Sequence, residues 1–450
     1  MIDLRGKAVA VVGLGRTALA LVRLLLREGA RPFVTDCAPR EKLEIGCREL
    51  ELLGVPFECG GHTERAFDGA SLIIPSPGVP LDLAPIRRAQ ERGAEVLGEM
   101  EYAFRFCRSR ILAVTGTNGK TTTTELLRVL IASCGHSVLL AGNNAFPFSA
   151  AVQASPAPEF IVLEVSSYQL ETVQTFRPWI GVVLNVTPDH LARHGSVANY
   201  TGVKARLFES MEAGDTAVLN YDDPLVRDMP APKAIGKRWF SLETRLSSGL
   251  WADGTKIYEG ENAVALVADS PLRGRHNLQN VLATLSMIRA GEFDWEKSLA
   301  GLRAFRGVEH RIEFVAEIRG TAFYNDSKST NIDSLKVALE SFEVPVILIA
   351  GGRGKGADYR VLRDLVRSRV KRLIVIGEDA PKLEAAFGDL VRTARAEDMD
   401  EAVRVAFDVA VPNDVVLLSP ACASFDMYEN FEHRGRVFKA AVARRRKEIS

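Results

Sequence analysis

Residues 114–124 combine glycines, threonines and a lysine at a spacing that can bind a polyphosphate. Two glycines, separated by two residues, are followed directly by Lys120 and Thr121. Such glycines let successive backbone N–H groups point at one anion, and the lysine adds a mobile cation. The threonine hydroxyl stands where these loops hold the Mg²⁺ that bridges phosphate oxygens. The predicted phosphate-binding residues are Gly116, Thr117, Asn118, Gly119, Lys120, Thr121 and Thr122.

The segments around this loop decide between a ligand site and a plain turn. An apolar run over 111–114 precedes it and a helical apolar pattern over 126–131 follows it, which predicts a strand, a loop and a helix. The loop is shorter than the G-x-x-x-x-G-K-S/T pattern, because Val114 stands five residues before Gly119. A glycine-rich turn without a ligand is the alternative. We favour nucleotide binding, because a Lys-Thr pair in this context is uncommon by chance.

Three further residues could act beside the phosphates. Glu164 ends an apolar run over 160–163, and an acid at the carboxyl end of a buried parallel strand is a candidate Mg²⁺ ligand. A helix-capping acid is the alternative. His190 also follows an apolar run, where it fits a ligand or an ordinary loop histidine equally well. Lys204 lies in an expected helix over 197–211, and its chemistry alone indicates a solvated ion-pair partner.

The amino-terminal residues have a second glycine pattern. An apolar run over 7–12 leads into Gly13-Leu14-Gly15, and a later strand ends at Asp36, as in folds that bind dinucleotides or nucleotide sugars. The pattern ends in alanine instead of a third glycine, so it fits a close-packed turn equally well. Ser76 and Gly78 lie in a proline-rich turn that either faces a ligand or lies on the surface.

The alternation of strands and helices predicts an α/β protein of three domains. We expect a Rossmann-like domain over 1–97, a central P-loop ATPase-type domain over 98–306 and a Rossmann-like domain over 307–450. Within the central domain, Asp253-Gly254 predicts a hairpin turn between short strands.

The third domain has unusual polar or glycine-rich runs, each directly after an expected strand. Because ligands of open α/β sheets bind at the carboxyl ends of the strands, these runs predict a second binding face. The runs cover residues 325–331, 351–356 and 419–426.

Composition limits the partners. Lys plus Arg and Asp plus Glu number 57 each, so no overall charge favours nucleic acid or a membrane surface, and small-molecule substrates are expected. The six cysteines have no metal or disulfide spacing and are interpreted as free thiols. No apolar run approaches the roughly 20 residues of a membrane span. We expect a cytoplasmic monomer.

Together these runs resemble the Mur ligases, ATP-dependent amide-forming enzymes of peptidoglycan assembly, along the whole chain. The family pattern is carried by the phosphate loop with Glu164, His190, Asn277, His310-Arg311 and Asp326-Ser327-Lys328. Residues 164–171, 351–356 and 419–425 are most similar to the members that add D-glutamate to UDP-N-acetylmuramoyl-L-alanine. The resemblance therefore implies that this protein catalyses the same ligation, through an acyl-phosphate intermediate.

The resemblance also implies roles for single residues. Lys120, His190 and Lys204 would be catalytic, with Lys204 carbamylated. Two Mg²⁺ ions would be held by Thr121, Glu164, His190 and Lys204. Beyond the loop, ATP would contact Asn277, Asn280, His310, Arg311 and Asp326, although the two asparagines also fit a helix cap. The UDP substrate would contact Gly13, Leu14, Arg16, Thr17, Asp36, Ser76, Gly78, Asn143, Ser166 and His190. D-Glutamate would contact Lys328, Thr330, Lys355, Ser424 and Phe431.

Two other functions stay open at this point. A ligase similar to folylpolyglutamate synthase would share the central loop, but the amino-terminal nucleotide-sugar domain and residues 419–425 disfavour it. A redox or regulatory module that binds NADH through the Gly13 pattern is the second alternative. Phosphate release from ATP that depends on an amino acid would exclude that module.

Overall fold

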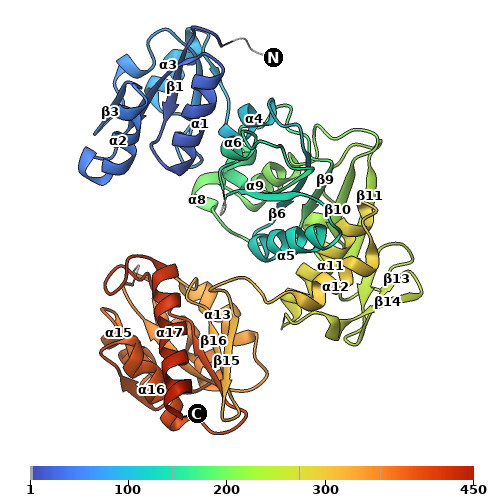
Figure 1. Ribbon diagram of the computed structural model, residues 1–450, viewed down its shortest axis with the longest axis vertical. Helices are drawn as coiled ribbons and strands as arrows, with labels where there is room; N and C mark the ends of the chain where they lie inside the picture. Colours follow the sequence, from blue (N-terminus) through green and yellow to red (C-terminus); the bar gives the residue numbers. More distant parts are fainter. Residues whose placement is uncertain (1–3, 144–145, 273, 355, 450) are drawn as a thin grey trace. The chain divides into compact units, whose positions relative to one another are not determined.

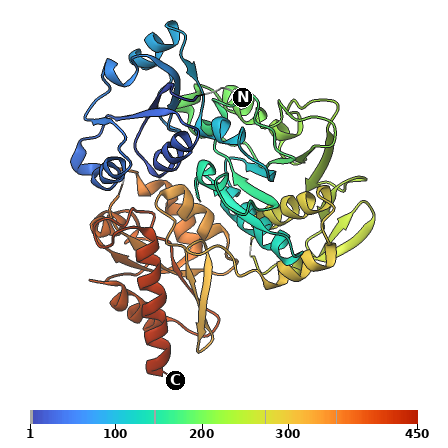
Figure 2. The same ribbon diagram turned by 45° about the horizontal axis from the view of Figure 1, so that its top comes forward.

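The chain folds into two compact units, both built of strands and covering helices (Figure 1, Figure 2). The computed structural model describes residues 4–143, 146–272, 274–354 and 356–449. The first unit comprises residues 1–269 with 279–303, and the second comprises 270–278 with 304–450. Across the described ranges the strands form two sheets in the first unit and one in the second, which confirms the predicted α/β class.

The amino-terminal sheet is parallel throughout, in the order β3-β2-β1-β4-β5. The chain leaves β1 toward one side and resumes at β4 on the other, so their carboxyl ends border the crevice where such sheets bind ligands. Leucines at helical spacing bury one face of α1 in the core. The strands are β1 (Ala8–Val12), β2 (Arg31–Asp36), β3 (Phe57–Cys59), β4 (Ala70–Pro75) and β5 (Glu95–Val96). The helices are α1 (Arg16–Arg27), α2 (Glu44–Leu52) and α3 (Ala84–Glu91).

The larger sheet of the first unit has the order β14-β13-β12-β11-β10-β9-β6-β8-β7. Its neighbours are parallel from β7 to β12, and β13 and β14 add an antiparallel edge. Residues 111–114 of β6 are all buried, as expected of a central strand covered on both faces. The strands are β6 (Arg110–Thr115), β7 (Val138–Gly142), β8 (Phe160–Glu164), β9 (Ile180–Val183), β10 (Thr216–Asn220), β11 (Gly236–Ser241), β12 (Leu250–Ala252), β13 (Lys256–Glu259) and β14 (Asn262–Leu266).

The helices of this region include α5, which follows the phosphate loop, and α11, which begins in the segment 270–278 of the second unit. All four tryptophans of the sequence belong to the first unit. Trp251 stacks on Tyr258 with ring centroids 4.3 Å apart, and the Arg110 guanidinium carbon lies 4.6 Å from the Trp179 ring centroid. The helices are α4 (Glu99–Phe104), α5 (Lys120–Ser133), α6 (Phe148–Ala151), α7 (Ser167–Leu170), α8 (Leu191–His194), α9 (Val197–Ala205), α10 (Pro224–Arg227), α11 (Arg275–Ala290) and α12 (Trp295–Ala304).

The second unit has a sheet in the order β15-β16-β20-β17-β18-β19, parallel except for β15 against β16. The long helix α17 packs beside α16 and against β15 and β16 (Figure 1). The strands are β15 (Glu313–Ile318), β16 (Thr321–Asn325), β17 (Val346–Gly351), β18 (Val370–Ile376), β19 (Thr393–Arg395) and β20 (Val415–Leu418). The helices are α13 (Ile332–Glu340), α14 (Arg363–Arg369), α15 (Ala380–Phe387), α16 (Met399–Val409) and α17 (Phe431–Ile449).

The local predictions are confirmed in part. Asp253 and Gly254 do connect antiparallel strands, and the Asp253 carboxylate accepts hydrogen bonds from the N–H groups of Thr255 and Lys256. The helix expected over 197–211 ends at Ala205 and continues as turns. The antiparallel edge strand β15 was not predicted, because its exposed Phe314 and half-buried Glu313 break the alternation of apolar and polar residues. The domain boundaries after residues 97 and 306 stay predictions.

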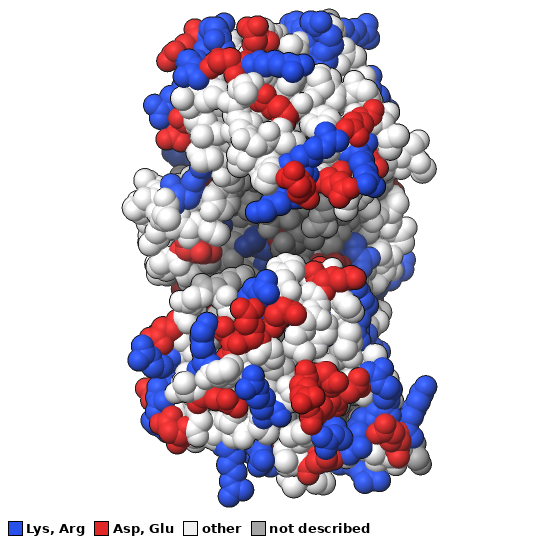
Figure 3. All heavy atoms as spheres, turned by 90° about the vertical axis from the view of Figure 1, so that its left-hand side faces the viewer, with Lys and Arg blue, Asp and Glu red and all other residues white. Residues whose placement is uncertain are grey.

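The surface agrees with the balanced composition. On the face shown in Figure 3, basic and acidic side chains are interspersed instead of gathered by sign. The cysteines are free, as expected, although the Sγ atoms of Cys47 and Cys59 lie 3.5 Å apart. Within the described ranges, no helix is both long enough and apolar enough to span a membrane.

Candidate active site

The phosphate loop joins the carboxyl end of β6 to the start of α5. Gly119 has a φ of 87°, in the left-handed region, and it caps α5. A Cβ on Gly119 would lie 2.2 Å from Oδ1 of Asn280, so this position requires glycine. The close approach places Asn280 of α11 against the loop. Asn277 lies three residues earlier on the same helix.

Side chains that follow β9 hold the loop in place. Asn185 Oδ1 accepts a hydrogen bond from the Asn118 N–H at 2.8 Å, and Asn185 Nδ2 donates to the Asn118 carbonyl at 3.2 Å. The Thr117 hydroxyl donates to the Thr187 carbonyl at 3.2 Å and lies 3.3 Å from the Tyr200 hydroxyl. The loop is therefore organised by the protein itself. Asn185 and Tyr200 were not predicted as site residues, because they belong to no recognised motif.

Lys120 folds back over the loop. Its Nζ donates hydrogen bonds to the carbonyl oxygens of Gly116 and Thr117, each at 2.8 Å. The ammonium thus lies at the mouth of the loop, where a phosphate could compete with the carbonyls for it. Thr121 and Thr122 follow in the first turn of α5, with the Thr122 side chain buried.

Glu164 ends β8, where the sequence predicted an acid at a strand end. Val114 is its partner in the β6 register, so Glu164 lies at the same sheet edge as the phosphate loop. Its side chain is 1% exposed, and Oε1 accepts a hydrogen bond from Asn143 Nδ2 at 3.1 Å. A buried carboxylate at this edge supplies the oxygen ligands that Mg²⁺ prefers.

Lys204 of α9 is 1% exposed, contrary to its expected solvation. Its Nζ lies 4.5 Å from the Tyr200 ring centroid, and the described residues provide neither a hydrogen bond nor an ion pair to it. Burial lowers the pKa of the amine to about 7, with a further decrease from Lys120 and an opposing effect of Asp189. A substantial fraction of the Lys204 side chains is therefore in the neutral amine form near pH 7.

His190 lies beside the rings of Tyr168 and Tyr200. Its backbone is in the left-handed region, with a φ of 52°. Its Nδ1 lies 3.3 Å from the Tyr168 hydroxyl, and its Nε2 lies 3.5 Å from Oδ2 of Asp189. Its ring centroid is 6.4 Å from that of Tyr200. Tyr200 thus contacts the phosphate loop, Lys204 and His190, which gathers three predicted positions around one phenol ring.

The amino-terminal candidates also converge. A Cβ on Gly13 would lie 2.6 Å from the Ser76 hydroxyl, so the turns after β1 and β4 touch. Asp36 accepts hydrogen bonds from the N–H groups of Leu14 and Ala38, each at 2.7 Å. Its carboxylate therefore organises the two loops around the predicted ligand position. Arg16 and Thr17 begin α1.

A cavity lies between the turn after β4 and the region around α7. Arg193 closes part of its wall, because its guanidinium donates to Glu171 Oε2 at 2.7 Å and to the Val79 carbonyl at 3.3 Å. Ser166 does not line this cavity, since its hydroxyl forms a capping box with Gln169. The lining residues include Ser76, Gly78, Tyr168, Gln169, Glu171 and Arg193.

In the second unit, Asp326 follows β16 and is buried. It accepts hydrogen bonds from the Ser419 hydroxyl at 2.8 Å and from the Ile312 N–H at 3.3 Å. Burial raises the pKa of this carboxyl to about 7, against the opposing effects of Ser419 and Arg311. Burial lowers the pKa of His276, and the charge of Arg311 lowers it further. The Arg311 guanidinium therefore lies close to both Asp326 and His276.

The residues predicted to bind the amino acid are partly gathered. Lys328 Nζ lies 5.9 Å from the Phe431 ring centroid, and Ser424 is buried. Thr330 directly precedes Asn331, which caps α13. Lys355 lies outside the described residues. The structure therefore brings Lys328 and Phe431 together, and the other assignments stay predictions.

Comparison with known proteins covers both units. The family model described as the Mur ligase MurD-like N-terminal domain matches residues 7–98, the Mur ligase middle domain matches 114–288, and the Mur ligase glutamate ligase domain matches 310–422. The chain is 43% identical to a UDP-N-acetylmuramoylalanine--D-glutamate ligase of Pelotomaculum thermopropionicum, over 98% of each chain. It is 41% identical to the enzyme of the same name from Koribacter versatilis, again over 98% of each.

Solved structures agree at the level of the fold. UDP-N-acetylmuramate-alanine ligase from Thermotoga maritima superposes with a TM-score of 0.60 and 19% identity, over 98% of this chain and 99% of that one. The MurF ligase of the same organism, solved in complex with ADP, gives 0.60 and 17%, over 99% and 100%. From the three matched family models and the full-length relatives, the chain belongs to the Mur ligase family.

Proposed function

We propose that this protein is an ATP-dependent ligase that adds D-glutamate to UDP-N-acetylmuramoyl-L-alanine. The observation that carries this proposal is the 43% identity, along the whole chain, to an enzyme named for that reaction. The gathered phosphate loop, Glu164, His190 and Lys204 supply the chemistry that such a ligation needs.

The reaction has to turn a carboxylate into an electrophile. A carboxylate oxygen of the L-alanyl group attacks the γ-phosphorus of ATP, the bond to the bridging oxygen breaks, and ADP leaves. The amine nitrogen of D-glutamate then attacks the acyl carbon of this acyl phosphate and forms the C–N bond. The C–O bond to phosphate breaks, inorganic phosphate leaves, and the amine releases its proton to solvent. Lys120 offsets the charge on the transferring phosphoryl group.

Most of the proposed metal ligands fit Mg²⁺ in chemical type. Thr121 and Glu164 offer the oxygen atoms that Mg²⁺ prefers. His190 offers an imidazole nitrogen, which is not a preferred Mg²⁺ ligand, and it is assigned by the family resemblance alone. Lys204 would join them as a carbamate, because a neutral amine reacts with carbon dioxide and its buried position favours the neutral form. Bound Mg²⁺ supplies positive charge that neutralises the phosphate oxygens.

The substrate assignments follow the two strand-end regions of the first unit. The crevice beside Gly13, Asp36 and Ser76 is proposed to hold the UDP group, with Leu14, Arg16, Thr17 and Gly78. The adjoining cavity is proposed to hold the remainder of the nucleotide substrate. Asn143, Ser166 and His190 are assigned to the same substrate by the family resemblance.

The second unit is assigned to the amino acid and to part of ATP. Lys328 is proposed to bind a carboxylate of D-glutamate, with the Phe431 ring centroid 5.9 Å from its Nζ. Thr330, Lys355 and Ser424 are assigned to the same ligand by the resemblance. ATP is assigned Asn277, Asn280, His310, Arg311 and Asp326 in the same way.

Phosphate release tests the proposal directly. The protein is incubated with ATP, Mg²⁺ and UDP-N-acetylmuramoyl-L-alanine, and D-glutamate, L-glutamate, D-aspartate or L-lysine is added in turn. Release that requires D-glutamate is the expected result. Release with another amino acid would keep the ligase and change its substrate. The absence of release with all four would contradict the ligase assignment.

A further inference from the structure

A strained turn precedes β15 in the second unit. His310 has a φ of 65° and Ile312 a φ of 45°, and both are in the left-handed region that side chains other than glycine avoid. Such conformations are energetically unfavourable, so surrounding contacts must hold the turn. Arg311, which the proposed function assigns to ATP, lies between the two.

Asn325 determines which nitrogen of His310 carries the proton. The Ser327 N–H donates to Asn325 Oδ1 at 3.1 Å, which fixes the orientation of the amide. Asn325 Nδ2 therefore donates, to His310 Nδ1 at 2.9 Å and to Glu313 Oε2 at 3.0 Å. Because Nδ1 accepts this bond, the ring proton lies on Nε2. Burial also lowers the pKa of His310, which favours the neutral ring.

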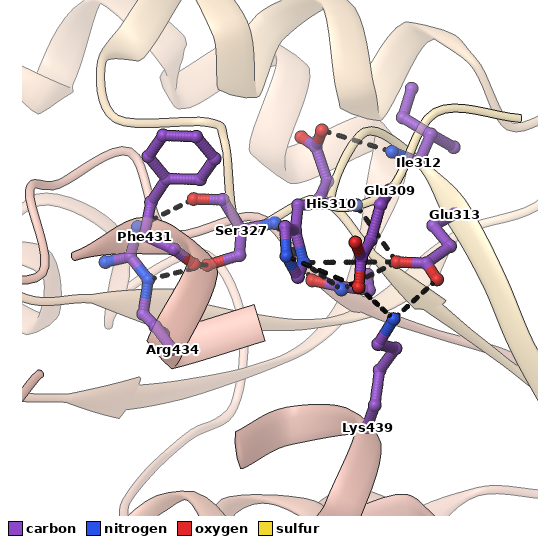
Figure 4. Close-up of polar contacts among 10 residues, drawn as sticks. Glu309, His310, Ile312, Glu313, Ser327, Phe431, Arg434 and Lys439 are labelled. Atoms are coloured by element: carbon purple, nitrogen blue, oxygen red, sulfur yellow. Dashed lines mark hydrogen bonds and ion pairs between the residues drawn. The ribbon is translucent and has the colours of Figure 1, made fainter. Parts of the chain in front are cut away.

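Lys439 of α17 pairs with the carboxylates of Glu309 and Glu313, which precede and follow His310 in the sequence (Figure 4). Its Nζ lies 2.6 Å from Glu309 Oε1 and 2.9 Å from Glu313 Oε1. Glu313 Oε2 in turn accepts the backbone N–H of His310 at 2.9 Å. A chain of contacts therefore runs from the helix to the backbone of the turn.

These donors could also suggest a metal site. Atoms of Glu309, His310 and Glu313 lie within 4.8 Å of one another. The ammonium of Lys439 already bridges the two carboxylates, however, and provides the positive charge that a metal would supply. The cluster is accordingly explained by a positioning role.

Gly435 provides the second contact from α17. A Cβ on this residue would lie 2.1 Å from His310 Nδ1, so the imidazole packs directly on the helix backbone. The Phe431 ring meets it edge-on, with centroids 6.1 Å apart. Helix α17 thus restricts the position of the His310 ring through Gly435 and Phe431, and the charge around that ring through Lys439.

We infer that Lys439 and Gly435 are positioning residues, which hold the Nε2–H imidazole of His310 in place and thereby fix the turn that presents Arg311. The consequence for ATP rests on the proposed function. The tautomer and the conformation of the turn do not depend on it.

Kinetics test the consequence for ATP in the full-length protein. Lys439→Met should raise the KM for ATP about tenfold and change kcat less than about threefold, because it disturbs a binding contact and spares the phosphoryl transfer. Lys439→Arg keeps the ion pair and should restore most of the affinity. Lys371→Met removes a comparable ion pair, 2.6 Å from Asp414, and should leave the KM unchanged. An unchanged KM for ATP in Lys439→Met would overturn the inference, whatever happens to its melting temperature.

Spectroscopy tests the tautomer without any substrate. With ¹⁵N-labelled histidine, the seven imidazoles can be resolved and His310 assigned from the signal lost in His310→Gln. The expected result is a proton on Nε2 and none on Nδ1 near neutral pH, and a changed signal in Gly435→Ala. A proton on Nδ1 would overturn the inference. The expected tautomer in a protein that ligates no amino acid would instead contradict only the proposed function.

Discussion

Lys204 and Asp326 are both buried ionisable groups, one in each unit, but the protein treats them differently. Burial moves the pKa of each to about 7, downward for the amine and upward for the carboxyl. Asp326 accepts hydrogen bonds from Ser419 and from the Ile312 N–H. For Lys204, the described part of the chain offers only the face of the Tyr200 ring to its Nζ.

The difference separates a carboxyl group whose hydrogen-bond partners come from the protein from an amine for which the described residues provide no hydrogen-bond partner. A buried polar group without a partner costs free energy, so a fold retains one where function uses it. Asp326 is satisfied by its own unit and can serve as a fixed part of the structure. Lys204 requires chemistry from outside the polypeptide, and a carbamate that binds Mg²⁺ would supply it.

The largest expected effect tests whether the first unit handles phosphate at all. Lys120→Ala should reduce turnover by roughly 10³-fold or more, because the ammonium stabilises the phosphoryl group mainly in the transition state. Single-turnover formation of ADP measures the chemical step. Lys237→Ala, which changes an exposed lysine of β11, serves as the control and should keep its activity. Near-normal turnover of Lys120→Ala would remove the basis of the comparison.

The second change addresses Lys204 directly. Lys204→Met keeps the length of the side chain and removes the amine, so ligation should fall by roughly 10²-fold if a carbamate is needed there. Saturation with Mg²⁺ should not restore it. Retained activity would mean that the amine is buried for structural reasons.

Stability of the same variant has a defined sign. The folded pKa of Lys204 lies below that of the unfolded chain, so burial of the charge destabilises wild type fully below pH 7. This penalty fades as the pH rises toward 10.5. Lys204→Met should therefore gain melting temperature over wild type at pH 6 and much less at pH 9. The opposite order would contradict the pKa shift.

Arg193 is a charged group of the first unit that, unlike Lys204, has hydrogen-bond partners within the protein. Arg193→Met breaks the contacts with Glu171 and Val79, and should raise the KM for the UDP substrate about tenfold without a similar change for ATP. Arg23→Met, which removes an exposed pair with Glu49, is the matched control. Equal changes in both KM values would indicate a general loss of structure.

The smallest expected effect belongs to Asp326. The folded pKa of Asp326 lies above its unfolded value of 3.8, so the carboxyl contributes no penalty in acid and destabilises the fold as the pH rises toward 7. Asp326→Asn should unfold about 2–4 °C higher than wild type at pH 8 and gain less at pH 5, where only part of the penalty is present. A higher melting temperature at pH 5 alone would contradict this sign.

Motifs in the sequence predicted the loop, its flanking strand and helix, and the strand end at Glu164, because these depend on local spacing. Burial of Lys204 could not be predicted, since its helix has a weak apolar pattern. Asn185 was missed for the same reason, because it acts through contact with a loop 67 residues away. The Ser166 hydroxyl is used in a helix cap, and its assignment to the substrate stays a prediction.

The confinement of all four tryptophans to the first unit has an optical consequence. Intrinsic indole emission therefore reports the unit that contains Lys204 and not the unit that contains Asp326, whose aromatic side chains are tyrosines and phenylalanines. A melt followed by fluorescence and by far-ultraviolet circular dichroism would resolve the two transitions without a label. The protein thus contains its own probe for assigning a stability change to one unit.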